Sequence, residues 1–136
     1  MLTENKDESG SYKVVRPNGA DAIDTLSEGE YNFISFLYFY HLCFGSKNKE
    51  DLNRKKIIVI DDPISSLDSN VMFIVSSLTK DILRKCKDNK DNINQVFVLT
   101  HNAYFYKEVT YWGSRESLSS TLVAYYVIKK KVKEVL

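Results

Sequence analysis

Two acidic residues and one histidine follow apolar runs in a way that suits phosphate chemistry. Asp61 and Asp62 come directly after the aliphatic run 57–60, and adjacent carboxylates at such a point can hold a hard cation or face a water molecule. His101 follows a second apolar run, 95–99. If both runs are strands of one parallel sheet, their carboxyl ends meet at the same edge, where ligands of α/β sheets bind. We therefore expect the three side chains to converge.

A third group, Leu26-Ser27-Glu28-Gly29-Glu30, opens a long aromatic segment. A helix that begins here offers free backbone N–H groups, the hydroxyl of Ser27, and a glycine at position 29 that allows close approach, and these together can bind a phosphate. The same residues also form a complete capping box, with Ser27 as N-cap and Glu30 three residues later. The sequence alone leaves both interpretations open.

The other two groups also have structural explanations. Asp61-Asp62-Pro63 would serve as an acidic turn, and a single histidine is more often structural than catalytic. His41, within the aromatic segment, is of that structural kind. The polar residues 65–69 would serve as an ordinary helix N-cap built on Asp68 or Ser69.

The elements that position these groups are indicated by periodicity. Residues 57–60 and 95–99 predict fully buried strands, and apolar residues spaced by three and four after Ser69 predict a helix between them. Further helices are expected over 27–44, where apolar residues occur all round, and over 104–112. Short strands are expected at 12–16 and, from its β-branched and aromatic content, at 120–128. This order predicts an α/β fold built from βαβ units, with flanking helices.

In order and spacing, LSEGE, IIVIDDPISSLDSN and VFVLTHN resemble the second half of the nucleotide-binding domain of ABC-type ATPases. The motifs correspond to the signature, Walker B, D-loop and switch histidine, and the resemblance covers about residues 12–112. Their wording looks closest to the bacterial anticodon-nuclease ATPases (PrrC and RloC type), and more broadly to the SMC and DNA-repair branch. The resemblance implies a P-loop NTPase sheet and catalysis by positioning and electrostatic stabilisation of a phosphoryl group.

The resemblance also implies roles for individual residues. Asp61 would hold Mg²⁺, Asp62 would replace the usual catalytic glutamate with a side chain one methylene shorter, and His101 would contact the γ-phosphate of ATP. Ser27 and Gly29 would contact the ATP held by the opposing subunit of a head-to-tail homodimer. The D-loop across that dimer interface would consist of Ser65, Ser66, Leu67 and Asp68.

The phosphate-cradling motif GxxxxGK[ST] does not occur in the 136 residues. We therefore expect a partial ABC-type ATPase domain over residues 12–136, preceded by a disordered or tag-like leader at 1–11, with the N-terminal Walker A lobe missing. That lobe becomes a predicted partner, and the chain alone should bind ATP weakly or not at all. An alternative is a non-catalytic interaction module, whose aromatic helix packs against a separate partner lobe.

The composition limits the other classes. A formal net charge of +1 gives no bulk attraction to nucleic acid, and the sequence leaves direct contact with nucleic acid open. No apolar run approaches the length of a membrane span. Two distant cysteines provide no zinc signature and fit a reducing compartment, so we expect a cytoplasmic protein. The resemblance suggests a tRNA-cutting nuclease or a DNA-linked protein as the controlled effector.

Overall fold

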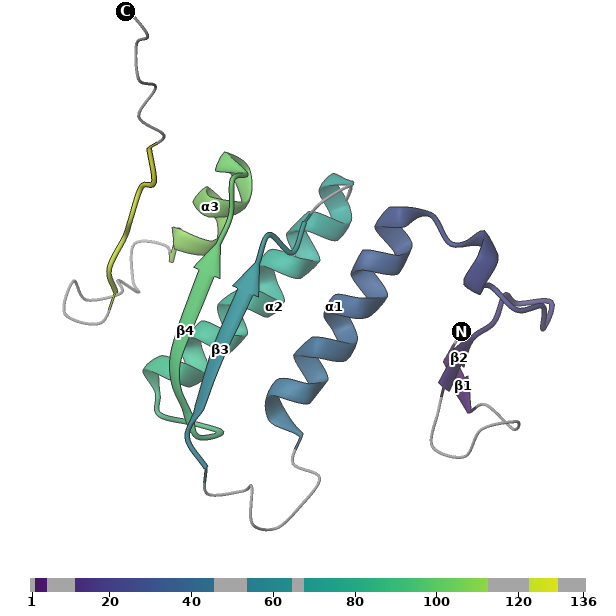
Figure 1. Cartoon of the computed structure of the whole chain (residues 1–136), viewed down its shortest axis with the longest axis horizontal. Helices are drawn as coiled ribbons and strands as arrows, with labels where there is room; N and C mark the ends of the chain where they lie inside the picture. Colours follow the sequence, from purple (N-terminus) through teal and green to yellow (C-terminus); the bar gives the residue numbers. More distant parts are fainter. Residues whose placement is uncertain (1, 5–11, 46–53, 65–67, 113–122, 130–136) are drawn as a thin grey trace, which may run out of the picture.

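The computed structural model describes residues 2–4, 12–45, 54–64, 68–112 and 123–129, and shows a small α/β arrangement (Figure 1). In the described residues, three α-helices and one 3-10 helix accompany two pairs of strands. The elements, in chain order, are β1 (Leu2–Glu4), β2 (Tyr12–Val14), η1 (Ile23–Thr25), α1 (Glu28–Phe44), β3 (Lys56–Asp61), α2 (Ser69–Lys87), β4 (Ile93–Leu99) and α3 (Ala103–Thr110).

The centre of the fold is the parallel pair β3 and β4, joined through α2. Their register places Val59 opposite Phe97 and Asp61 opposite Leu99, so both strands end at the same level. A parallel pair needs a crossover connection, and α2 supplies it. The predicted βαβ unit is confirmed, together with the helices that the sequence indicated at 27–44 and 104–112.

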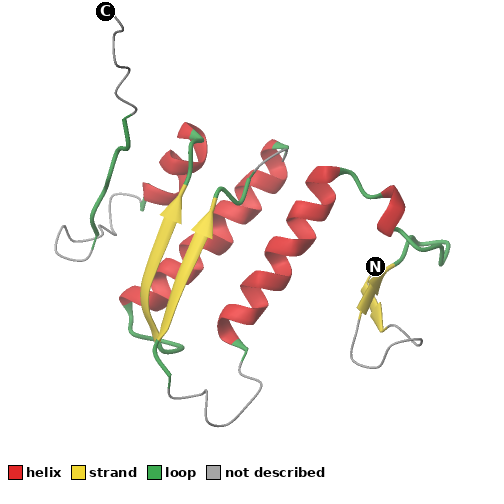
Figure 2. Ribbon diagram, viewed as in Figure 1, coloured by secondary structure: helices red, strands yellow, loops and turns green. Residues whose placement is uncertain are grey.

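The helices lie on one side of this pair, as Figure 2 shows, and α2 packs against both β4 and α3. The core forms between them, where inward side chains of both strands meet apolar faces of the helices. In α2 the buried hydroxyls of Ser76 and Thr79 donate to the carbonyl oxygens four residues earlier, each at 2.8 Å. These hydroxyls therefore need no further partner. The buried core residues are Phe36, Cys43, Ile58, Ile60, Ile64, Val75, Ile82, Ile93, Phe105 and Val109.

The other face of the sheet is uncovered by the described residues. Ile58 and Ile60 point into the core, but Val59 is 53% exposed and Phe97 is 46% exposed on the opposite face, with Ile57 and Leu99 beside them. The prediction that both strands are fully buried is therefore wrong for the described part of the chain. Parallel sheets are normally covered on both faces, so this apolar surface is the unusual feature of the fold.

Helix α1 shows the same departure from expectation. Its apolar residues all round predicted burial on most faces, yet only Phe36 and Cys43 are buried, while Tyr31, Tyr38 and Leu42 are exposed. The apolar sequence was sufficient to predict the helix, but not which of its faces other elements cover. The helix ends before Gly45, as expected.

The two ends of the chain differ from their predictions. Leu2–Glu4 lies within the segment expected to be a leader, and it pairs as β1 with β2 in an antiparallel ladder; residues 5–11 lie outside the described residues. The strand expected at 120–128 does not form over 123–129, where the chain has no regular secondary structure, and 120–122 are not described. Among the described residues, no helix is long and apolar enough to cross a membrane.

Candidate functional site

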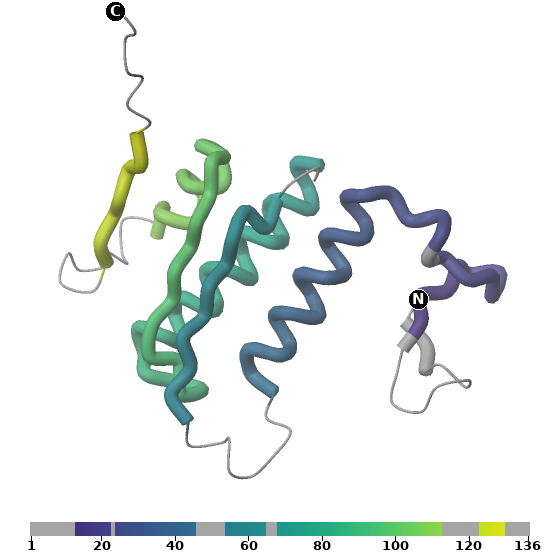
Figure 3. The backbone as a smooth tube through the Cα atoms, in the orientation of Figure 1, coloured from purple at the N-terminus to yellow at the C-terminus, as the bar shows by residue number. Residues whose placement is uncertain are grey.

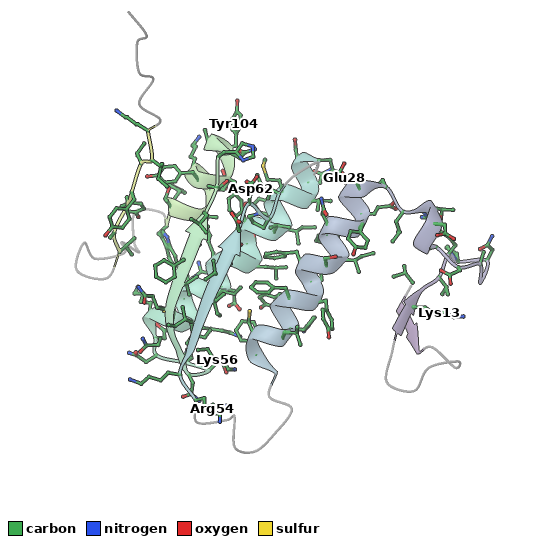
Figure 4. All side chains as sticks on the ribbon, in the orientation of Figure 1. Lys13, Glu28, Arg54, Lys56, Asp62 and Tyr104 are labelled. Carbon is green, nitrogen blue, oxygen red and sulfur yellow. The ribbon has the colours of Figure 1, made fainter. Side chains whose placement is uncertain are left out.

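Strands β3 and β4 end, and helices α1, α2 and α3 begin, at one edge of the molecule. Figure 4 places the labelled residues Glu28, Asp62 and Tyr104 along this edge, and Lys56 and Arg54 at the opposite one. Each helix N-terminus carries the positive end of the helix dipole, and each is capped by a side chain, Ser27 in α1, Asp68 in α2 and Asn102 in α3. The edge thus combines three partially positive helix ends with the carboxylates that follow β3, a combination suited to a phosphate and its cation.

Asp62 lies at the centre of the edge and contacts His101. One carboxylate oxygen, Oδ2, is 2.7 Å from His101 Nδ1, and the backbone N–H of Asp62 donates to the carbonyl oxygen of Leu99 at 2.8 Å. The backbone of Asp62 has φ +41°, in the left-handed region that aspartate tolerates better than most residues. The predicted convergence of Asp62 and His101 is therefore present as a direct contact.

The two ring nitrogens of His101 have different roles in this contact. Nδ1–H donates to the Asp62 carboxylate, which leaves Nε2 as the ring nitrogen that is not used by Asp62. The His101 side chain is 83% exposed and that of Asp62 is 25% exposed, so the carboxylate is held against the protein and the ring extends into solvent. This arrangement fixes the orientation of the imidazole.

Thr100 is a site residue that the sequence analysis missed. Its hydroxyl donates to Asp62 Oδ1 at 3.2 Å and accepts the backbone N–H of Asn102 at 3.0 Å. Asn102 in turn caps α3, because its side-chain oxygen accepts the N–H groups of Tyr104 and Phe105. The segment Thr100-His101-Asn102 is thus tied to Asp62 on one side and to α3 on the other. The only signal in the sequence was the position of this segment after a strand.

Asp61 is the last residue of β3 and is exposed. It borders a hollow of about 360 Å³ between the end of β3 and the first half of α1, which Asp62 also lines. Tyr31, Asn32 and Ser35 of α1 form the opposite wall. Oxygen ligands of this kind fit Mg²⁺, which typically takes one or two carboxylates together with phosphate oxygens and water. Within the described residues, no group of three or more His, Cys, Asp or Glu side chains could hold a metal by itself.

Ser27 is the N-cap of α1, and its capping box is complete. The backbone N–H of Glu30 donates to Ser27 Oγ at 3.2 Å, and the backbone N–H of Ser27 donates to Glu30 Oε2 at 2.8 Å. The structural interpretation of this motif is therefore confirmed. The backbone N–H and then the hydroxyl of Ser27 hold the pKa of Glu30 below its ordinary value of 4.5. Gly29 lies in the first turn of α1 and is half-buried.

Arg16 braces this helix start from the β2 side. Its guanidinium donates to the carbonyl oxygen of Thr25 at 2.9 Å and to the Thr25 hydroxyl at 3.3 Å, and it lies 3.5 Å from Glu30 Oε1. The brace draws Glu30 toward Ser27 and Arg16. Glu30 Oε2 consequently lies 3.1 Å from Ser27 Oγ, beside the hydroxyl at the start of α1.

The D-loop positions are described only at their last residue. Asp68 is the N-cap of α2 and accepts the N–H groups of Asn70 and Val71, each at 2.9 Å. The capping role expected for it is confirmed. Ser65, Ser66 and Leu67 lie outside the described residues.

A family model described as an AAA domain matches residues 1–135. The chain belongs to this AAA-domain family. An AAA domain of this kind is an ATPase-type domain, which supports the nucleotide and metal use expected of the site in general terms. The small parallel sheet with three helices agrees with such a domain.

Two curated relatives are 38% identical to this AAA domain over 90 residues, which is 65% of the chain. Both carry the printed name "Uncharacterized chromosomal cassette SCCmec type IVc protein CR006", one from Staphylococcus aureus strain MRSA252 and one from Staphylococcus aureus. The chain spans only 12% of the length of these relatives. No solved structure matches the chain.

Proposed function

We propose that this chain carries the signature, Walker B and switch-histidine part of an ABC-type, SMC-like ATPase that hydrolyses ATP with Mg²⁺. The observation that carries the proposal is the contact between Asp62 and His101 at the edge where β3 and β4 end and the three helices begin. Family membership supports an ATPase-type activity. The finer assignment depends on the three motifs and on this contact.

Asp61 would hold Mg²⁺ from the end of β3, where it lines the hollow. When bound, the ion neutralises charge on the phosphate oxygens in the transition state. Gly29 and Ser27, at the start of α1, would bind phosphate through the helix N-terminus and the serine hydroxyl. In the proposed head-to-tail homodimer that phosphate belongs to the ATP of the other subunit.

Asp62 and His101 would act as one unit. Asp62 accepts Nδ1–H and thereby fixes the tautomer of the imidazole, so that Nε2 is the atom available to a phosphate oxygen or to the attacking water. The second oxygen of Asp62 is engaged by the hydroxyl of Thr100. His101 would thus compensate for the shorter side chain of Asp62, because the imidazole that Asp62 holds extends further into solvent than the carboxylate does.

The phosphate-cradling part must come from elsewhere, because GxxxxGK[ST] does not occur in these 136 residues. We propose a Walker A-bearing lobe as the partner of this chain, and a D-loop formed by Ser65, Ser66, Leu67 and Asp68 at the dimer interface. The motif wording further suggests a cytoplasmic ATPase that controls an anticodon-nuclease-like or DNA-linked effector in phage defence. Without the lobe, the chain should bind ATP weakly.

The uncovered sheet face favours a second function. Ile57, Val59, Phe97 and Leu99 are exposed together on one face of the sheet, and an exposed apolar patch of this kind marks an interface more often than a solvent face. A module that only docks onto a partner lobe through this face would need neither carboxylate. The two functions therefore differ in their dependence on Asp62.

The deciding measurement is ATP turnover by the complete natural gene product with Asp62→Ala. We expect turnover to be lost while ATP still binds, because Asp62 orients His101 rather than holding nucleotide. Asp24→Ala, at an exposed acidic residue of η1, is the matched control and should retain turnover. Unchanged turnover in Asp62→Ala would reject the assigned role, and sub-micromolar ATP affinity of the 136-residue chain by calorimetry would reject the need for a partner lobe.

A further inference from the structure

Two consecutive residues after β4 contact the two oxygens of one carboxylate. The Thr100 hydroxyl donates to Asp62 Oδ1 at 3.2 Å, and His101 Nδ1 lies 2.7 Å from Asp62 Oδ2. The backbone N–H of Asp62 also donates to the carbonyl oxygen of Leu99 at 2.8 Å, so the backbone and the side chain of Asp62 are both bonded to the end of β4. Figure 3 shows β3 and β4 ending side by side, with α3 directly after β4. The carboxylate is therefore coupled to the segment that carries the histidine.

The hydroxyl proton of Thr100 has a defined direction. The hydroxyl oxygen accepts the backbone N–H of Asn102 at 3.0 Å. A hydroxyl has one proton, and because the N–H of Asn102 can only donate, that proton is the one given to the carboxylate of Asp62. Threonine is also stiff at χ1, because its Cβ is branched. The half-buried Thr100 side chain thus makes both hydrogen bonds from one rotamer.

The same hydroxyl shapes the backbone before α3. In an extended strand, consecutive side chains point to opposite faces, so Thr100 and His101 would point away from each other. The hydrogen bond from the N–H of Asn102 to the hydroxyl two residues earlier closes a turn, and His101 lies at the bend. The bend brings the imidazole and the hydroxyl to the same carboxylate. Asn102 then caps α3, in which Phe105 is fully buried, so the turn is held against the core.

We propose that Thr100 is a positioning residue for the Asp62–His101 pair. Its hydroxyl holds Asp62 Oδ1 and closes the turn, and together these two bonds bring Asp62 Oδ2 to Nδ1 of His101. The imidazole then keeps its proton on Nδ1 and leaves Nε2 as an acceptor for the attacking water. This inference rests on the proposed function for the role in ATP turnover, whereas the geometry of the pair is tested on the 136-residue chain.

The geometry is tested by the tautomer of His101 in the 136-residue chain. NMR of the imidazole nitrogens in alkaline buffer, where imidazole is neutral, distinguishes Nδ1–H from Nε2–H, and the unmodified chain should hold His101 mainly as Nδ1–H. Thr100→Val removes the hydroxyl and keeps the branched shape. The ratio of Nδ1–H to Nε2–H should then fall by about tenfold, because a hydrogen bond to a charged group is lost. Thr100→Ser keeps a hydroxyl and should restore the Nδ1–H tautomer, and His41 on α1 is the internal reference in each spectrum.

Thr110→Val is the matched control. The Thr110 hydroxyl donates within α3, to the carbonyl oxygens of Tyr106 at 2.7 Å and Lys107 at 3.3 Å. Both valine variants lose one threonine hydroxyl, so a general loss of stability would affect them alike, whereas only Thr100→Val should alter the tautomer of His101. An unmodified chain with His101 mainly as Nε2–H, an unchanged tautomer in Thr100→Val, or a Thr100→Ser variant that matches Thr100→Val would each overturn the positioning of the pair.

The role in turnover is tested on the complete natural gene product. Thr100→Val should lower kcat by at least about tenfold and leave KM for ATP unchanged, because Thr100 acts on the pair rather than on bound nucleotide. Thr100→Ser and Thr110→Val should keep the kcat of the unmodified protein. A shifted tautomer with unchanged kcat would overturn the role in turnover. If the unmodified gene product does not hydrolyse ATP, the proposed function fails, and the tautomer still decides whether Thr100 positions the pair.

Discussion

Replacing Ser27 by alanine separates the structural role of the signature serine from its proposed role in phosphate binding. Ser27 Oγ accepts the N–H of Glu30 at 3.2 Å, and the variant loses this bond. The reciprocal bond, from the N–H of Ser27 to Glu30 Oε2, uses the backbone and remains. Loss of a serine N-cap typically costs about 1 kcal/mol, within a range of about 0.5–2 kcal/mol.

That cost should be visible in thermal unfolding of the 136-residue chain. A destabilisation of about 1 kcal/mol lowers Tm by about 3–5 °C in a domain of this size. Circular dichroism at 222 nm, a wavelength that reports helix, would follow the transition. Ser35→Ala is the matched control, because Ser35 is exposed on the same helix and alanine is the better helix former; its Tm should stay equal or rise slightly. A Tm for Ser27→Ala equal to that of Ser35→Ala would refute the cap as a source of stability.

The functional role needs a variant that keeps the cap. Asparagine is as good an N-cap as serine and, unlike aspartate, sets no second carboxylate beside Glu30 Oε2, which lies 3.1 Å from Ser27 Oγ, so the free energy of unfolding of Ser27→Asn should stay within about 0.5 kcal/mol of that of the unmodified chain. The variant lacks the hydroxyl that would donate to a phosphate, so the complete gene product with Ser27→Asn should lose ATP turnover. Full turnover in this variant would show that the hydroxyl acts only as a cap.

Three further predictions concern the elements around the site. Asp68→Ala should destabilise the chain by about 1 kcal/mol, because α2 loses a cap that accepts two N–H groups, whereas Asp68→Ser should unfold normally; equal denaturation midpoints for the two would contradict this. Because the pKa of Glu30 is lowered in the folded chain, its contribution to stability is present above 4.5 and is lost as pH falls through the lowered value; a carboxyl titration by NMR that gives Glu30 a pKa of 4.5 or more would be the opposite result. Phe97→Lys should leave Tm nearly unchanged and increase solubility, since this side chain is half exposed on the uncovered face; a large fall in Tm would show that Phe97 is part of a core.

The local elements could be predicted because their signals lie within short segments. The β-branched run at 57–60, the caps at Ser27 and Asp68, and the apolar spacing after Ser69 each specify a conformation through neighbours only a few residues away. The shared edge of the site followed from one general rule about parallel strands. The caps and the local elements do not depend on which distant elements surround them, whereas the shared edge requires that β3 and β4 pair.

The features that escaped prediction all depend on distant partners. Tyr40 Oη of α1 donates to Asp81 Oδ2 of α2 at 2.7 Å, although the two residues are separated by 41 positions and no spacing rule links a tyrosine in one helix to an aspartate in another. The positive φ of Asp62 and the hydrogen bond from Thr100 to its carboxylate arise only when β3 and β4 pair. The strand expected at 120–128 had the right composition, but a strand also needs a partner edge, and 123–129 pairs with none among the described residues.

The uncovered sheet face and the candidate site are not independent features. Val59 belongs to the apolar face and also lines the hollow that Asp61 and Asp62 border. Any lobe that covers Val59 therefore brings its own groups next to both carboxylates. Docking and nucleotide binding would then stabilise each other by the same factor, because linkage between two binding events is reciprocal. The enzymatic and the docking hypotheses thus use the same surface of the molecule. Loss of ATP turnover in Asp62→Ala is the result that distinguishes a catalytic site at this edge from a surface that only binds a partner.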